Sequence, residues 1–170
     1  WLSERYYWNA VKPDQDKVTA RCAAQPEPQG YFVRVERDAK VTFPCQAGLY
    51  LSENQVSQMV HNVVLLEEGA ELQMITGCVT GMHVEEGLHM AITEQYIGKN
   101  AQLTSTMLHK WGPGVSVYPR TGTIVAEQGA LVSNYVALEP PREIRLSPNT
   151  WLEGAGASAR YRSIVLGKPG

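Results

Sequence analysis

The amino-acid sequence predicts an all-β protein that winds as a right-handed parallel β-helix of stacked turns, each about 30 residues long. A two-residue signature, a small polar residue or glycine followed by alanine, recurs five times, with 31, 31, 29 and 27 residues separating successive alanines. After each copy, apolar and polar residues alternate with the two-residue period of a strand that buries one face. The copies are Asp38-Ala39, Gly69-Ala70, Asn100-Ala101, Gly129-Ala130 and Gly156-Ala157.

This alternation assigns one face of each strand to a core and the other face to water. Counted from each alanine, the even positions carry no Asp, Glu, Lys or Arg, whereas the odd positions are mostly polar. We therefore expect the even positions of successive turns to stack inside the helix at the strand spacing of ~4.8 Å. The expected interior positions are Val41, Phe43, Cys45, Leu72, Met74, Thr76, Cys78, Leu103, Ser105, Met107, His109, Val132, Asn134, Val136, Leu138, Ala159, Tyr161, Ser163 and Val165.

The first part of the chain differs from the rest. Residues 1–29 are expected to form an N-terminal lid or linker, with a short helix or lid in the aromatic-rich stretch Trp1–Trp8. The stretches 12–16 and 25–30 hold the proline and glycine residues typical of turns and linkers. Residues 30–170 are expected to form the β-helix core, incomplete at its C-terminal end, in a segment of a longer protein.

Each predicted turn of the core holds two strand arms separated by a corner. One arm follows the alanine signature, and the second precedes the next signature, at Gln55–Leu66, Gly87–Ile97 and Thr121–Ala126. Glycine and proline place the corners at 77–81, 111–114 and 139–141. A β-sandwich and a cupin-like barrel are the competing folds, but neither predicts the same turn in register five times.

Composition narrows the possible functions. A net charge of −2 offers no basic field for nucleic acid or anionic lipid. No apolar run approaches the ~20 residues of a membrane span, and no signal peptide precedes the first polar residues. Three cysteines without regular spacing argue against a disulfide framework and are typical of a reducing cytoplasm.

A series of short motifs passes through the turns in a fixed order. They are Leu66–Leu72, the corner Ile75–Cys78, Gly87–His89, the S-T-x-x-x-x-W spacing within Thr104–Trp111, and Ser133–Tyr135. In order and spacing they resemble the SufB/SufD family of iron–sulfur cluster assembly proteins. The resemblance extends from about Tyr31 to the C-terminus and is closest to the shorter archaeal-type members, which share the opening Tyr7-Trp8-Asn9.

The resemblance implies a scaffold subunit rather than an enzyme. It implies pairing with a second SufB/SufD-like β-helix subunit, in a homodimer or heterodimer, and with an ABC-type SUF ATPase that would carry the ATPase activity. Sulfur would come as persulfide from a cysteine desulfurase system, meet iron in a nascent iron–sulfur cluster, and pass to apo-proteins. A second cluster-ligating cysteine and the ATPase-docking helices are expected beyond residue 170.

Four residues correspond to positions that the family uses. Cys78 matches the cysteine implicated in accepting sulfur inside the helix. His109 and Trp111 match a Gln and a Trp that line the same interior path, and Arg120 lies near a Lys there. The presence of His109 where the family has Gln is a departure from its pattern.

The residues themselves leave alternatives open around Cys78. Cys78 and His109 share an even position on successive turns, so we expect them to be interior neighbours and possible metal ligands. A histidine beside a thiol can favour the nucleophilic thiolate. A buried cysteine can also simply pack, and a bulge at Gly77 would turn Cys78 outward. His89 is expected to face outward, and Arg120 either lines a tunnel or faces water.

Two other function classes compete with the scaffold. Many β-helices are polysaccharide lyases or hydrolases, which need clustered acids or calcium-binding carboxylates on an outward face. Here all three aspartates, Asp14, Asp16 and Asp38, lie in the first quarter of the chain. A purely structural module that binds partners through its open sheet edges is the third possibility.

Overall fold

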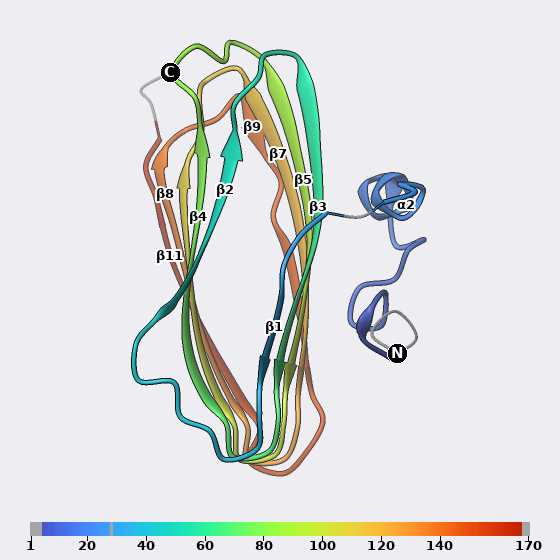
Figure 1. Ribbon diagram of the computed structural model, residues 1–170, viewed down its shortest axis with the longest axis vertical. Coiled ribbons are helices and arrows are strands. Elements are labelled where there is room, and N and C mark those ends of the chain that lie inside the picture. Colours follow the sequence, from blue (N-terminus) through green and yellow to red (C-terminus); the bar gives the residue numbers. More distant parts are fainter. Residues whose placement is uncertain (1–4, 28, 168–170) are drawn as a thin grey trace.

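The computed structural model describes residues 5–27 and 29–167, and the chain forms two facing parallel sheets wound as a solenoid of about five turns (Figure 1). The first sheet has the order β1-β3-β5-β7-β10, with β9 also paired to β7; the second has the order β11-β8-β6-β4-β2. The predicted all-β parallel β-helix is confirmed. The strands are β1 Phe32–Val35, β2 Cys45–Leu51, β3 Val56–Leu66, β4 Glu71–Thr80, β5 Gly87–Ile97, β6 Gln102–Lys110, β7 Val115–Val125, β8 Ala130–Glu139, β9 Glu143–Ile144, β10 Ser147–Leu152 and β11 Ser158–Val165.

One residue with left-handed backbone geometry recurs in every turn that joins the first sheet to the second. The φ angles are 58° at Asp38, 70° at Gly69, 57° at Asn100, 55° at Gln128 and 74° at Gly156. Glycine and asparagine tolerate this geometry better than other residues, which explains part of the sequence signature. The backbone N–H of each of the first four donates to a carbonyl in the next turn, at 2.8–3.0 Å. The solenoid ladder therefore continues through the turns.

The fourth turn corrects the predicted register by one residue. Gln128, rather than Gly129, takes the left-handed position, so Leu103 pairs with Leu131 instead of Val132. Leu131 is 2% exposed and belongs to the core. Because side chains alternate along a strand, a one-residue shift exchanges the two faces of β8. The interior positions of β8 are Leu131, Ser133, Tyr135 and Ala137, and the predicted set Val132, Asn134, Val136 and Leu138 was wrong.

The first turn departs from prediction in another way. Lys40 pairs with Glu71, yet Cys45 pairs with Met74, so the first turn has two residues more than the second between these pairs. The extra length forms a loop, and Phe43 within it is 81% exposed rather than interior. Cys45 keeps an interior position because an even insertion preserves the alternation.

The interior of the solenoid changes character along the strands. Near the turns, leucine, valine and methionine side chains from both sheets form an apolar cluster that includes Leu66, Leu72 and Leu103. Near the corners, a second cluster holds Cys78 and Trp111. The middle of the solenoid is lined mainly by polar side chains such as those of serine, threonine and glutamine.

The N-terminal segment lies against the outer face of the first sheet, on the right in Figure 1. Its helix α2 (Lys17–Ala23) begins at a capping box, in which the Asp16 carboxylate accepts from Thr19 N–H and the Thr19 hydroxyl accepts from Asp16 N–H. Residues 1–4 of the predicted aromatic helix or lid lie outside the described residues. Within the described ranges, no helix is long and apolar enough to cross a membrane.

Candidate functional site

The site begins with Cys78, whose place inside the solenoid is confirmed. It lies on β4, is 1% exposed, and pairs in register with Leu49 of β2 and His109 of β6. Pairing continues through Gly77 without a register shift, so the bulge that would have turned Cys78 outward does not form. The predicted neighbours Cys78 and His109 are therefore adjacent on successive turns.

An aromatic row extends from His109 across the corner end of the interior. The rings of His89 and Trp111 lie 4.6 Å apart, and those of Trp111 and His109 lie 5.6 Å apart. His109 Nδ1 is 2.9 Å from the Tyr135 hydroxyl oxygen. Trp111 is fully buried, and its indole N–H has no hydrogen-bond partner among the described residues.

The interior position of His89 overturns the expectation that it faces outward. Its Nδ1 lies 2.8 Å from Oε1 of Gln58, and its side chain is 1% exposed. The neighbouring residues Met90 and Ile92 take the outer positions at this end of β5 and are covered by the N-terminal segment. Polarity alone misplaced His89, because its imidazole is hydrogen-bonded to Gln58 inside the solenoid and packs against Trp111.

Burial keeps the groups of the site neutral. It raises the pKa of the Cys78 thiol to about 12 and lowers the pKa of the His109 imidazole to about 4. Burial, together with the nearby His109, lowers the pKa of His89 to about 3. The expectation that His109 favours a Cys78 thiolate is therefore wrong for the resting protein, because the interior penalises each charged form. Burial and then the nearby Cys78 raise the pKa of Tyr135, so its hydroxyl can donate to neutral His109.

A cavity of about 90 Å³ lies in the middle of the solenoid beside this row, lined by hydroxyl and amide side chains together with apolar ones such as Met107 and Leu146. Thr76, two residues before Cys78, and Tyr135, the partner of His109, are among its lining residues. Gln95 crosses it, donating to Ser105 Oγ at 3.4 Å and accepting from Thr123 Oγ1 at 2.9 Å. The side chains named are uncharged, so the cavity offers hydrogen bonds without fixed charge. The spacing of the motifs gave no sign of this cavity, although the run of Ser and Thr at interior positions is its sequence signal.

The structure places Arg120 away from the interior. It lies on the outer face of β7, where its Nε donates to Asp16 Oδ2 at 2.6 Å and its Nη1 donates to the Arg145 carbonyl at 2.9 Å. The neighbouring residues Pro119 and Thr121 line the cavity instead. The prediction that Arg120 lines the interior path is therefore wrong, as is the alternative that it faces water, since it is only 8% exposed.

The described residues contain no group of three or more His, Cys, Asp or Glu side chains placed to hold a metal ion. Cys78 and His109 therefore supply at most two ligands. The other two cysteines are separate from them, because Cys22 packs between helix α2 and the outer face of the first sheet, and Cys45 packs in the apolar cluster near the turns.

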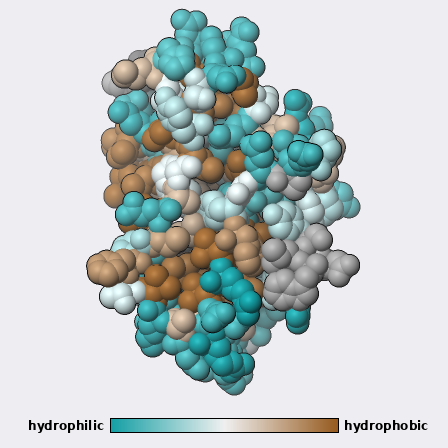
Figure 2. Space-filling model, viewed as in Figure 1, coloured by the Kyte–Doolittle hydropathy of each residue, from teal (hydrophilic) through white to brown (hydrophobic). Residues whose placement is uncertain are grey.

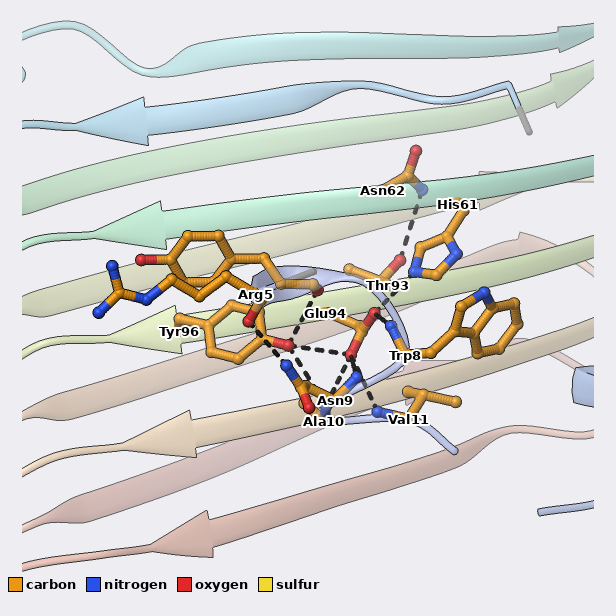
Figure 3. A network of polar contacts seen from close by, with 11 residues as sticks. Arg5, Trp8, Asn9, Ala10, Val11, His61, Asn62, Thr93, Glu94 and Tyr96 are labelled. Atoms are coloured by element: carbon orange, nitrogen blue, oxygen red, sulfur yellow. Dashed lines mark hydrogen bonds and ion pairs between the residues drawn. The ribbon is translucent and has the colours of Figure 1, made fainter. Parts of the chain in front are cut away.

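A second polar centre, which the motifs did not indicate, lies on the outer face of β5. Glu94 is fully buried there, and its carboxylate accepts four backbone N–H groups of the N-terminal segment (Figure 3). The donors are Trp8 at 2.6 Å, Asn9 at 2.8 Å, Ala10 at 2.6 Å and Val11 at 3.1 Å.

Two side chains of the solenoid complete this centre. His61 Nε2 lies 2.7 Å from Glu94 Oε1, and the Tyr96 hydroxyl donates to Oε2 at 3.0 Å. The ring of His61 is covered by Tyr7 and Trp8, with ring centroids at 4.3 and 4.6 Å. Glu94 therefore fixes the N-terminal segment to the solenoid, on the opposite face of the first sheet from the cavity.

Comparison with known proteins agrees with this architecture. The family model for the SUF system FeS cluster assembly, SufBD core domain, matches residues 49–170. A SufBD family iron–sulfur cluster assembly protein of Methanothermobacter thermautotrophicus is 39% identical over 99% of this chain and 42% of its own length. One from Archaeoglobus fulgidus is 38% identical over 100% of this chain and 45% of its own length. One from Pyrococcus horikoshii is 27% identical over 98% of this chain and 37% of its own length.

The chain thus spans less than half the length of these relatives, and the match to the family model begins at β2 and includes the whole Cys78 region. Together with the parallel solenoid, these similarities show that the chain belongs to the SufBD family of iron–sulfur cluster assembly proteins.

Proposed function

We propose that this chain is the β-helix portion of a scaffold on which a SUF-type complex builds iron–sulfur clusters, with Cys78 as the residue that accepts sulfur. In this proposal the chain catalyses no turnover of its own. Sulfur reaches Cys78 through the polar interior, meets iron there or nearby, and leaves as part of a nascent cluster. The cluster is cargo that passes to apo-proteins.

One observation carries the proposal: a buried thiol lies beside a hydroxyl-lined cavity inside the solenoid. Cys78 is 1% exposed, so bulk oxidants and thiols have little access to it. The cavity begins at the neighbouring interior position, Thr76, and offers hydrogen-bond donors without fixed positive charge. Such an environment suits a small sulfur species that must be held weakly and passed on.

The transfer step balances without an added oxidant or reductant. The Cys78 sulfur attacks the terminal sulfur of a donor persulfide, the donor S–S bond breaks, and the donor leaves as a thiol. The proton of Cys78 passes to the leaving sulfur, directly or through His109. Because burial raises the pKa of Cys78 to about 12, the thiol stays unreactive until a donor sulfur lies in contact with it.

Iron binding needs ligands beyond this site, since Cys78 and His109 supply at most two. We propose that a second SufB/SufD-like subunit and the remaining length of the family supply the others. An ABC-type ATPase and a cysteine desulfurase system in the cytoplasm complete the proposed assembly. The ATPase activity belongs to that partner.

Sulfur acceptance can be tested by peptide mass spectrometry after anaerobic incubation with cysteine persulfide. We expect the peptide containing Cys78 to gain the mass of one sulfur atom, and Cys78→Ala to lose this product. Cys22 is a matched control, because it is also buried and burial likewise raises its pKa, to about 11. Equal modification of Cys22 and Cys78, or modification of Cys45 alone, would contradict the proposal.

Iron binding has a separate test. Anaerobic incubation of the full-length protein, together with its proposed partner subunit, with ferrous iron and sulfide is expected to give brown absorbance that is lost in Cys78→Ala and kept in Cys22→Ala. Brown absorbance that persists in Cys78→Ala would show that other residues hold the cluster. Sulfur acceptance without cluster formation would limit the role of this chain to sulfur transfer.

A further inference from the structure

The outer face of the second sheet carries an apolar strip that crosses its strands near their C-terminal ends. Leu108 pairs in register with Val136, and Val136 pairs with Ile164. Leu138 has no partner on β6, because the pairing of β6 with β8 shifts by one residue between His109 and Lys110. Leu108, Leu138 and Ile164 are 36%, 47% and 61% exposed. We define the outer apolar strip by Val79, Leu108, Val136, Leu138 and Ile164.

The strip is a surface feature rather than a part of the core. Its residues alternate along the strands with the interior residues Cys78, His109 and Ala137, so they point outward. Apolar side chains gather along the left edge of the molecule in Figure 2, outside the upper part of the sheet that contains β8 and β11 in Figure 1. Large exposed apolar patches on a protein surface commonly mark interaction sites.

Two glycines shape one end of the strip. Gly48 pairs with Gly77, which pairs with Leu108, so two adjacent strands carry no side chain at this position. A Cβ atom added at either glycine would meet no atom within 4 Å. Tyr50, 55% exposed, rises beside them on β2. The glycines therefore leave a shallow depression bordered by Tyr50 and the strip.

The charged side chains on β11, at the other end of the strip, are both positive. Arg160 and Arg162 lie on the outer face of β11, four and two residues before Ile164, respectively. Both are exposed, and neither forms an ion pair with the described residues. Lys110 beside the strip is already paired with Glu139 at 3.6 Å. The strip thus ends in two free positive charges.

We propose that the outer apolar strip is a docking surface for an amphipathic α-helix of a partner protein, with carboxylates at the end that lies over β11. From the depression at Gly48 on β2 to Ile164 on β11, this surface crosses five strands, which at ~4.8 Å spacing is ~19 Å, the length of about 13 helical residues. The helical pitch of ~5.4 Å nearly matches the strand spacing, so each turn of the helix meets one strand. Its apolar residues at helical spacing would pack along the strip, and its carboxylates would reach Arg160 and Arg162.

Two other occupants fit less well. In a second copy of this chain, the carboxylates of Glu71 and Glu139 on this face are already paired with Lys40 and Lys110, so none is free for the arginines. An anionic membrane would be attracted by only two arginines on a chain with a net charge of −2. Charge complementarity therefore favours a partner that is both apolar and acidic.

The test uses two fluorescently labelled helical peptides of about 14 residues, matched to the strip in length. Both carry leucines at helical spacing, and one ends in three glutamates where the other ends in three lysines. We expect the wild-type chain to bind the glutamate peptide at least about tenfold more tightly in anisotropy titrations. Leu108→Lys should weaken this binding by about tenfold or more, whereas Gln73→Lys, on the same face outside the strip, should leave it unchanged.

A charge exchange separates specific docking from general apolar adhesion. Arg160→Glu with Arg162→Glu should weaken binding of the glutamate peptide and strengthen binding of the lysine peptide. Equal binding of both peptides to every variant would overturn the proposal. Dimerisation in sedimentation that Leu108→Lys abolishes would assign the strip to a second copy, and binding to phosphatidylserine vesicles in place of the peptide would assign it to a membrane. Either result would also overturn the proposal.

Discussion

Replacement of Glu94 by alanine should release the N-terminal segment from the solenoid. In the native protein, one fully buried carboxylate accepts backbone N–H groups from four consecutive residues, Trp8 to Val11. Among the residues that the structure describes, three of these N–H groups have no other acceptor, and that of Ala10 has only the Tyr96 hydroxyl, at 3.3 Å. The substitution therefore removes the acceptor of an entire stretch of backbone at once.

The expected size of the effect follows from the number of bonds. A hydrogen bond to a charged group contributes roughly 1.5–3 kcal/mol, so four contribute roughly 6 kcal/mol or more if the segment stays in place. That is comparable with the whole stability of many domains, ~5–15 kcal/mol. Detachment lets the four N–H groups bind water and loses mainly the packing of Val11 and Cys22 on Met90 and Ile92. Detachment is therefore the less costly response.

Amide hydrogen exchange measures this response directly. In Glu94→Ala we expect the amides of Trp8 to Val11 to lose protection, while amides in β5 and β7 keep theirs. Glu94→Gln retains one carbonyl acceptor, so the protection of these amides should lie between that of the wild-type chain and that of Glu94→Ala. Glu127→Gln is the control, because Glu127 is exposed and forms only a surface ion pair with Lys99. Unchanged protection of residues 8–11 in Glu94→Ala would refute the reasoning.

The same contact should respond to acid. Burial alone would raise the pKa of Glu94, but hydrogen bonds from His61, Val11 and Trp8 outweigh it and hold the pKa below the usual 4.5. A carboxylate with a lowered folded-state pKa stabilises the fold fully above its unfolded-state pKa, and this contribution is lost as pH falls through the folded-state value. Protection of the segment should therefore be constant near neutral pH and decline below about 4.5.

Two further predictions concern the interior. Leu131→Asp should lower the free energy of unfolding, measured in urea, by about 3 kcal/mol or more, because Leu131 is interior. Val132→Asp, on the outer face, should lower it by less than about 1 kcal/mol. A larger loss for Val132→Asp than for Leu131→Asp would support the register predicted from the sequence, in which Val132 is interior. Alkylation of Cys78 by iodoacetamide at pH 9 should be much slower in the native chain than in urea, because burial both shields the thiol and raises its pKa. Equal rates in the native chain and in urea would show an exposed thiol.

The fold could be predicted from the sequence because the solenoid repeats its constraints. Each turn needs a left-handed residue at one position and an alternating strand after it, and both leave visible marks in the sequence. The prediction failed at the turn between β7 and β8, where the left-handed residue is Gln128 rather than Gly129. Because Gly129-Ala130 also has the form of the signature, the sequence comparison aligned this turn one residue too late. Gly129 takes the second position, which alanine holds in the other turns, so a signature that requires alanine there selects the wrong alignment.

The site was predicted less completely. The stacking of Cys78 and His109 followed from their shared interior position. The placement of His89 and Arg120 did not, because each lies where polarity is a poor guide: His89 is buried inside the solenoid beside Gln58 and Trp111, and Arg120 lies beneath the N-terminal segment. Glu94 was missed for the same reason, since its partners are backbone N–H groups that no side-chain pattern reveals.

The central claim is that sulfur reaches Cys78 through the interior cavity, and the rate at which Cys78 gains sulfur tests it most directly. Ser105 lines the cavity, and its near neighbour Thr104 lies on the outer face of the same strand. With cysteine persulfide as donor, Ser105→Leu should slow the gain of one sulfur by Cys78, whereas Thr104→Leu should leave its rate unchanged. Equal rates in both variants and the wild-type chain would contradict the account.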